Sequence, residues 1–375
     1  MSGATAPRSL ESRARVASLA LALAPGVGCA KYRELVGRFG SGERAFDEHV
    51  GRGDRDALVQ AAREAFEDAR RVGAELLLLD DARYPAALHD LPNPPLVLYA
   101  AGALSWLEPS KLTDTPSEAT TNGHEAHQPA VAPPVVAIVG TRRATAYGAR
   151  VTREIATHLA RAGAVVLSGM ARGIDAEAHV GGLAGRTAAV LGTGIDIAYP
   201  AGHRALHAEI RSRGLLLSEQ PPGARATAGS FPERNRIIAA LARMTIVVEA
   251  GRKSGALITA ARALDLDRIV AAVPGPIDVP QSAGSNELLR DGAQIITSAE
   301  DALALAGLTP AARSPAIDAA GPDRAIWDAV GAGAHDLDTI SSLTALPARE
   351  VMAGITRLEL RGAVECLLTG EIRRR

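Results

Sequence analysis

Five segments of the sequence place glycines next to hydroxyl, acidic or basic side chains directly after short apolar runs. Glycine turns that lead into helices present backbone N–H groups to an anion, and neighbouring arginine or lysine side chains add positive charge. The pattern therefore predicts a site for a phosphate-bearing ligand. The candidate binding residues in the three segments with basic side chains are Gly140, Thr141 and Arg142; Ser168, Gly169, Arg172 and Gly173; and Lys253, Ser254 and Gly255.

The common nucleotide-binding motifs are missing from these segments. A dinucleotide site needs Gly-x-Gly-x-x-Gly after the first strand and an acidic residue that closes the second. The segment 140–145 lacks the later glycines, and Ser168 stands where the acid belongs. A P-loop needs a glycine directly before Lys-Ser, and Arg252 precedes Lys253. Alternatively, the glycines only form tight turns and helix caps. Five such clusters, each directly after a predicted strand of one parallel sheet, would lie at the same edge of that sheet and therefore favour a shared ligand.

A further basic segment, FPERNRII, begins a predicted helix. Successive helical residues point about 100° apart, so its two arginines and its asparagine cannot all face the core. At least one arginine is expected at the ligand edge. The aromatic ring either stacks on a base, which is worth about 1–3 kcal/mol, or packs as a hydrophobic staple on the first helical turn. The candidate binding residues are Phe231, Arg234, Asn235 and Arg236.

No catalytic or metal-binding constellation can be assigned from residue spacing. Asp175 and His179 are four residues apart, which is typical of a helix-capping acid with a polar neighbour. His203 and His207 share this spacing without a third ligand, and such a pair usually lies on a solvated helix face. The sequence predicts a binding protein that needs no metal or cofactor and is not an enzyme.

The elements that position these residues are short apolar runs that alternate with segments of helical length, such as 146–161 and 254–266. Strands that are apolar on both faces and joined by helices predict a parallel sheet covered on both sides. The predicted fold class is α/β, a Rossmann-like doubly wound parallel sheet, which binds ligands at the carboxyl ends of its strands. The predicted strands are Val135–Val139, Ala164–Ser168, Thr187–Leu191, Leu215–Ser218, Thr245–Val248 and Arg268–Val273.

The chain divides into four predicted parts. Residues 8–106 form an N-terminal helical region and lead-in, and residues 107–134 form a disordered linker or insertion rich in Glu, Pro, Thr and Ser. Residues 135–308 form the Rossmann-like domain, and a weaker linker follows. Residues 322–372 read as three helices and a β-hairpin with a turn at 369–370, which suggests a winged helix. Its third helix has few basic residues, which favours a protein-interaction or dimerisation role over DNA binding.

Composition limits the class of protein. The net charge is −1, so any nucleic-acid site must be a local basic patch. The two cysteines, Cys29 and Cys366, indicate neither a zinc site nor a disulfide framework, and a reducing, cytoplasmic location is expected. No stretch reaches the ~18 apolar residues of a membrane span. The best candidate, 16–24, reads as an amphipathic helix.

The middle segment resembles the DNA-processing protein A (DprA/Smf) family. The similar motifs occur in the family's order and cover almost all of residues 135–295. They are VAIVGTRRATAYG, LSGMARGIDAEAH, TAAVLGTGIDIAYP, LLSEQPPG, FPERNRIIAAL, VVEAGRKSGALITA, AVPGPID and GSNELLRDGA. The turn at 25–28 resembles a helix-hairpin-helix or SAM-like region, and the C-terminal part resembles the family's winged helix.

The resemblance implies a single-stranded-DNA-binding protein that protects incoming DNA and loads the RecA recombinase during natural transformation and DNA recombination. It also implies a homodimer formed through the Rossmann domain, with DNA in a positively charged pocket at the strand ends, where the candidate residues above are expected. The alternative is a Rossmann-fold nucleotide phosphoribohydrolase-like enzyme, in which Glu249 would be catalytic. The Pro-Gly-Gly-x-Gly-Thr run of such enzymes is absent.

Overall fold

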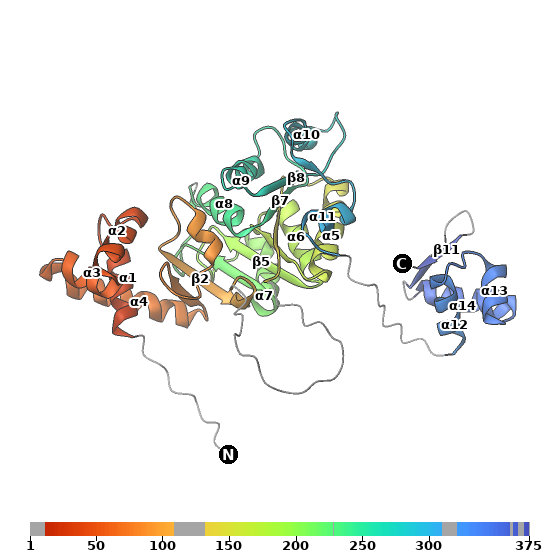
Figure 1. Cartoon of the computed structure of the whole chain (residues 1–375), viewed down its shortest axis with the longest axis horizontal. Helices are drawn as coiled ribbons and strands as arrows, with labels where there is room; N and C mark the ends of the chain where they lie inside the picture. The colour runs from red at the N-terminus through yellow and green to blue at the C-terminus, as the bar shows by residue number, and fades with distance from the viewer. Residues whose placement is uncertain are drawn as a thin grey trace, which may run out of the picture. The chain divides into compact units, whose positions relative to one another are not determined.

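The computed structural model describes residues 12–108, 132–227, 229–309, 321–360, 363–366 and 371–374. The chain divides into two compact units, Met1–Ala311 and Ala312–Arg375 (Figure 1). Most of the predicted linker 107–134, most of the weaker linker before residue 322 and the hairpin turn at 369–370 lie outside the described residues.

Four helices open the first unit. Ser12 and Ser41 cap two of them, because their side-chain oxygens accept hydrogen bonds from the N–H groups of Arg15 (3.3 Å) and Arg44 (3.2 Å). The first helix is buried from residue 16 to residue 21 because it packs against the third and fourth helices. The sequence predicts an amphipathic helix here, and that prediction is wrong. The helices are α1 (Arg13–Leu23), α2 (Cys29–Phe39), α3 (Gly42–His49) and α4 (Arg52–Arg71).

A nine-stranded sheet forms the centre of this unit, with the strand order β1-β2-β6-β5-β4-β3-β7-β8-β9. The six predicted strands coincide, within one residue at each end, with the parallel strands β3 to β8, which confirms the α/β fold. The strands are β1 (Glu75–Leu78), β2 (Val97–Gly102), β3 (Val135–Val139), β4 (Val165–Ser168), β5 (Arg186–Leu191), β6 (Leu215–Ser218), β7 (Met244–Val247), β8 (Ile269–Ala272) and β9 (Gln294–Ile295).

The sheet is larger than the sequence predicts, because β1 and β2 come from the lead-in that reads as helical. β2 pairs antiparallel with both β1 and β6, so this edge of the sheet is not parallel. A short, continuously apolar run does not distinguish a strand from a buried helix segment by its period alone, which explains the omission. The lead-in is therefore an integral part of the sheet.

Helices cover both faces of the sheet (Figure 1). On β3, Val136 and Ile138 pack with α5, α6 and α11, whereas Ala137 and Val139 belong to the core shared with α8, α9 and the N-terminal helices. This alternation is the period of two expected of a strand. The helices are α5 (Ala146–Arg161), α6 (Ile174–Gly182), α7 (Arg204–Arg213), α8 (Ser230–Leu241), α9 (Gly255–Leu264), α10 (Ala283–Arg290) and α11 (Ala299–Leu305), with 3₁₀ turns η1 (Ala86–Asp90), η2 (Leu104–Trp106), η3 (Ala201–His203) and η4 (Pro280–Ser282).

The second unit has its own small core, formed by residues such as Ile326, Ile340 and Val351. Arg357 donates hydrogen bonds to the Asp323 carboxylate (3.1 and 3.0 Å) and thereby joins the first helix of this unit to the third. The elements are α12 (Pro322–Gly331), α13 (Leu337–Thr344), α14 (Ala348–Leu360) and the antiparallel pair β10 (Val364–Cys366) and β11 (Ile372–Arg374). Three helices followed by a two-stranded wing match the predicted winged-helix arrangement.

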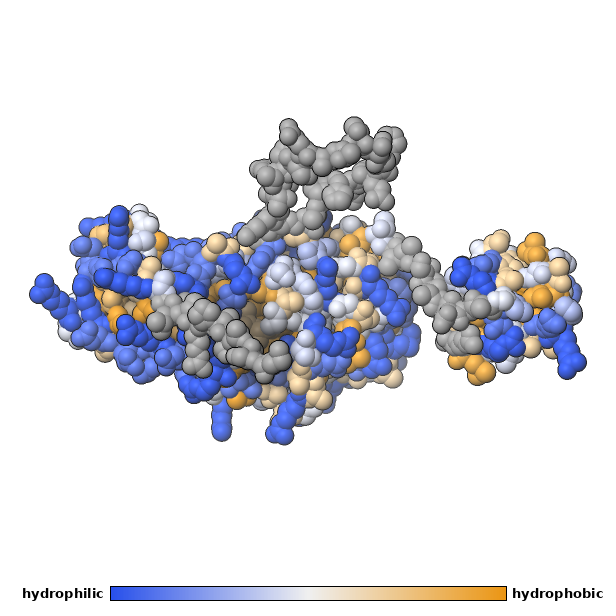
Figure 2. Space-filling model, turned by 90° about the horizontal axis from the view of Figure 1, so that it is seen from below, coloured by the Kyte–Doolittle hydropathy of each residue, from blue (hydrophilic) through white to orange (hydrophobic). Residues whose placement is uncertain are grey.

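The face seen in Figure 2 is largely hydrophilic, with hydrophobic residues in small separate groups. Within the described part of the chain, none of the helices combines the length and the apolar character that a membrane crossing requires.

Candidate functional site

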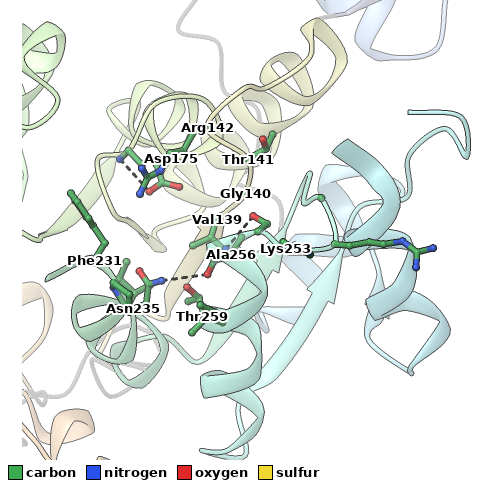
Figure 3. A pocket seen from close by; sticks show the side chains of 18 of the residues that line it. Val139, Gly140, Thr141, Arg142, Asp175, Phe231, Asn235, Lys253, Ala256 and Thr259 are labelled. Atoms are coloured by element: carbon green, nitrogen blue, oxygen red, sulfur yellow. Dashed lines mark hydrogen bonds between the residues drawn. The ribbon is translucent and has the colours of Figure 1, made fainter. Parts of the chain in front are cut away.

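A cavity of about 920 Å³ opens at the carboxyl ends of β3 and β7, where a doubly wound sheet is expected to bind its ligand. Its size is that of a site for a small organic ligand. The structure brings nine of the predicted residues together around it (Figure 3). They are Gly140, Thr141, Arg142, Phe231, Arg234, Asn235, Lys253, Ser254 and Gly255. The five predicted residues that do not line it are Ser168, Gly169, Arg172, Gly173 and Arg236.

The turn after β3 forms one wall. A Cβ atom on Gly140 would lie 2.6 Å from Ile174 Cγ1 and 2.7 Å from the Glu249 carbonyl oxygen, so only glycine fits there. The Thr141 N–H donates to that same carbonyl oxygen (2.6 Å). The sequence predicts that this N–H is free to bind an anion, and that prediction is wrong. The Arg142 side chain is exposed and supplies the positive charge of this wall.

The start of α8 forms the opposite wall, with Phe231 and Asn235 across from Arg142 (Figure 3). The half-buried Phe231 ring contacts two groups: its centroid is 5.2 Å from Arg142 Cζ and 5.2 Å from the centre of the Tyr199 ring. Its partners are therefore a cation and a second aromatic ring. Asn235 Nδ2 donates to the Gly255 carbonyl oxygen (3.4 Å) and ties α8 to α9.

The start of α9 completes the rim. Ser254 caps this helix, since its Oγ accepts the Ala256 N–H (3.3 Å). The side chains of Arg252 and Lys253 are exposed just before the helix, where its dipole already favours negative charge. Together with Arg142, these residues give the pocket three exposed cations around its mouth.

Two buried side chains of opposite charge, Arg234 and Asp175, form the floor of the pocket. Arg234 Nη1 donates to the Val190 carbonyl oxygen (2.7 Å), and Asp175 accepts the Ala171 N–H (3.2 Å). Burial raises the pKa of Asp175, an effect that the Arg234 charge opposes, and burial lowers the pKa of the Arg234 guanidinium. A Cβ atom on Gly169 would lie 1.7 Å from Arg234 Nη1, so this glycine makes room for the buried guanidinium. The floor is therefore close to neutral.

The remaining predicted residues have structural partners or lie beside the pocket. Ser168 is fully buried and donates to the Ile138 carbonyl oxygen (2.6 Å). Gly173 has a φ of +74° and borders the backbone of Thr141, so it shapes the turn. Arg172 is exposed outside the pocket lining. Arg236 Nη2 donates to both carboxylate oxygens of Glu219 (2.6 and 2.7 Å), so this arginine is engaged away from the pocket.

The histidines are mostly held by backbone or hydroxyl groups. His207 is buried and donates from Nε2 to the Ile195 carbonyl oxygen (3.0 Å). The prediction that it lies on a solvated helix face is therefore wrong. His203 Nδ1 donates to the Met170 carbonyl oxygen (3.1 Å). His179 is fully buried beside Thr187 (2.8 Å), and burial lowers its pKa to about 3. The described residues contain no group of three or more His, Cys, Asp or Glu side chains that could hold a metal ion.

Glu249 serves the start of α5. Its carboxylate accepts hydrogen bonds from the Thr145 N–H (2.9 Å) and Thr145 Oγ1 (2.5 Å), and its side chain is buried and absent from the pocket lining. This carboxylate is therefore occupied by the protein itself.

Residues 109–307 match the family model of DNA recombination-mediator protein A, which is more than half of the chain. The chain belongs to the DprA family. Residues 309–367 match the DprA winged helix domain. The DprA/Smf resemblance read from the motifs is thereby confirmed, and so is the winged helix.

Relatives and solved structures agree with this family. The chain is 38% identical over 329 residues to a DNA processing protein DprA of Mycobacterium tuberculosis, covering 82% of this chain and 79% of the relative. It is similar to the structure of DNA processing protein A from Streptococcus pneumoniae (TM-score 0.54, 33% identity, 66% of this chain and 81% of the other). It is also similar to the Helicobacter pylori protein, described for its single-stranded DNA binding mode (TM-score 0.52, 31% identity, 63% and 98%).

Among the residues that line or flank the site, Tyr199, Arg252 and Asp175 were not predicted as binding residues. Tyr199 follows β5 and meets Phe231 only in the folded chain, so no local pattern points to it. Arg252 directly precedes the predicted residue Lys253, and its positive charge is the feature of the sequence from which its place at the site could have been predicted.

Proposed function

We propose that this DprA-family protein binds single-stranded DNA in the pocket at the ends of β3 and β7. The observation that carries the proposal is the contact of Arg142 with Phe231 at a mouth that also holds Arg252 and Lys253. Cations on the rim bind phosphates, and an aromatic ring accepts any base by stacking. The related Helicobacter pylori protein, whose structure is described by its single-stranded DNA binding mode, supports the same ligand.

The pocket favours sequence-tolerant binding. Its exposed polar groups are chiefly cationic, and the nearly neutral pair of Arg234 and Asp175 is buried in its floor. Recognition then depends on phosphate charge and on stacking. The bases of duplex DNA are already stacked on each other, so a duplex can bind the pocket only through the charge of its phosphates.

In the cell, the protein protects incoming single strands and loads the RecA recombinase on them during natural transformation and DNA recombination, in the cytoplasm. This role accords with the match to the DNA recombination-mediator protein A family and with the cations and the aromatic ring at the mouth of the pocket. The test is a nuclease-protection and strand-exchange assay with RecA on strands coated by single-strand-binding protein. The wild type should slow digestion and accelerate RecA filament formation, and Arg142→Ala should do neither. Equal protection by wild type and variant would contradict the role of this pocket.

The homodimer forms through the open edge of the Rossmann sheet. β9 pairs only with β8 among the described strands, and its Ile295 is 56% exposed. Leu264, 57% exposed, lines an adjacent groove of about 350 Å³ together with Leu288. An exposed apolar strand edge is a site for pairing with another chain. Light scattering across a concentration series should give a dimer for the wild type and a monomer for Leu264→Glu; a monomeric wild type would refute the dimer.

The alternative function, hydrolysis of nucleoside monophosphates, depends on Glu249. Its carboxylate binds Thr145 instead of facing the pocket, which argues against a catalytic role. Incubation with nucleoside monophosphates should release no free base. Release of base by the wild type, lost in Glu249→Gln, would establish the enzyme instead.

A further inference from the structure

Tyr199 is an exposed aromatic residue in a chain that has few. The residue is 45% exposed, and its ring lies 5.2 Å, centre to centre, from the Phe231 ring at an interplanar angle of 38°. Its contact with Phe231 is the interaction that the described residues give it, and its hydroxyl forms no hydrogen bond with them. The ring therefore has an open surface beside the pocket and no internal function for its polar end.

The segment that carries Tyr199 is held by hydrogen bonds on both sides. The Gly194 N–H donates to the Ala224 carbonyl oxygen (2.8 Å), and Asp196 Oδ1 accepts the Gly223 N–H (2.8 Å). Thr193 Oγ1 donates to the Ile197 carbonyl oxygen (2.8 Å) inside the turn. A ring on so fixed a segment loses little conformational entropy when it binds a ligand.

Positive charge accompanies this segment. The His203 Nδ1 bond to the Met170 carbonyl oxygen (3.1 Å) holds the segment after Tyr199 against the turn that carries Arg172. Arg172 is exposed, and none of the described residues forms an ion pair with it. A phosphate group that passes Tyr199 would therefore meet an available guanidinium.

We propose that Tyr199 is a second base-stacking residue, on which the single strand continues after it leaves the pocket beside Phe231. The inference rests on the proposed function and adds a direction to it: the strand crosses the carboxyl edge of the sheet from β3 toward β5. The two ring centres are 5.2 Å apart, which is less than two steps of ~3.4 Å between stacked bases. Phe231 and Tyr199 thus receive neighbouring bases of one strand, and Arg172 receives a phosphate.

The test compares Tyr199→Ala, Tyr199→Phe and Phe231→Ala on a dT decamer and on an abasic decamer, which keeps the phosphates but offers no base to stack. Tyr199→Ala should weaken binding to the dT decamer roughly 5- to 100-fold and leave binding to the abasic decamer unchanged. Tyr199→Phe should match the wild type on both, because the hydroxyl has no partner. A Tyr199→Trp variant should bind normally, and its fluorescence should be quenched by dT and not by the abasic strand.

The matched control is Phe39→Leu, which removes another ring in contact with an arginine, Arg38, on α2. It should bind both decamers as the wild type does. Full affinity of Tyr199→Ala for dT, or an equal loss on both decamers, would overturn the stacking role while Phe231→Ala still reports on the pocket. A wild type that binds neither decamer would instead refute the proposed function. Thermal unfolding of each variant checks that the fold is kept.

Discussion

Arg236 Nη2 lies 2.6 and 2.7 Å from the two carboxylate oxygens of Glu219. Both side chains are largely buried, 18% and 27% exposed. Burial raises the pKa of Glu219, and the neighbouring arginine opposes that shift. One face of α8 thus carries residues of the pocket, whereas Arg236 anchors the helix to the segment that follows β6.

Replacement of Arg236 by alanine should therefore reduce stability more than DNA affinity. Glu219 would lose its partner, which we expect to cost about 1–3 kcal/mol. Urea unfolding should show this loss, and it should be smaller in a Glu219→Gln background. The dependence of single-strand affinity on salt should remain that of the wild type. A reduced salt dependence in Arg236→Ala would mean that this arginine does bind phosphate.

Replacement of Arg142 by alanine should have the opposite profile. The exposed guanidinium lies over Phe231 at the mouth, so the substitution removes a group that binds phosphate and leaves the core intact. For each phosphate that the variant no longer binds, the slope of log affinity against log salt should fall by about 0.7. The matched control is Arg262→Ala on α9, an exposed arginine that pairs with Asp265. Equal salt-dependence slopes for Arg142→Ala and Arg262→Ala would contradict the proposal that Arg142 binds a phosphate at the mouth of the pocket.

Replacement of Glu249 by glutamine should affect the fold of the first unit. The buried carboxylate accepts two hydrogen bonds from Thr145 at the start of α5, and a charged acceptor there is stronger than an amide. We expect a loss of about 1–2 kcal/mol of stability, measured by urea unfolding, with single-strand affinity nearly unchanged. Full stability of the variant would show that these hydrogen bonds contribute little.

His179 should make the first unit less stable in acid. The Thr187 hydroxyl donates its proton to the Val166 carbonyl oxygen (3.0 Å), so His179 Nδ1 must donate to Thr187 and Nε2 is buried without a described partner. Burial lowers the pKa to about 3, from 6.5. Below pH 6.5 the unfolded chain binds a proton that the folded chain excludes until about pH 3, so stability falls as pH falls through this window.

Because of this histidine, the free energy of unfolding should be about 2 kcal/mol lower at pH 5 than at neutral pH. Urea midpoints of the wild type and of His179→Asn, measured from pH 7 to pH 4.5, check the effect. The His179→Asn variant should be less stable at neutral pH and show a shallower decline. Parallel declines would assign the acid sensitivity to other groups.

The strands and the position of the site follow from the sequence because their signals are local. Apolar runs such as 135–139 and 215–218 are buried on both faces, and parallel strands end at one edge, so the glycine clusters were expected to converge. β1 and β2 were missed because their apolar runs are short and belong to a lead-in dominated by helical patterns, with β1 directly after the 20-residue helix α4. Local pattern does not separate such runs from buried helix segments.

The roles of individual side chains depend on contacts between distant segments. Helical geometry shows that Arg234, Asn235 and Arg236 point in different directions, but it does not show which one meets a partner. Arg234 is buried because Gly169 makes room for it and Asp175 compensates its charge. Tyr199 reaches Phe231 from another strand end. No spacing within one motif contains this information.

The most direct test of single-strand binding at the strand-edge pocket is a titration of the wild-type protein with labelled oligo-dT. Affinity is measured for the single strand and for the same strand in a duplex with oligo-dA, across a series of salt concentrations. We predict tighter binding of the single strand and a linear fall of log affinity with log salt, with a smaller slope for Arg142→Ala. Equal affinity for both forms, or an affinity that does not change with salt, would contradict the account.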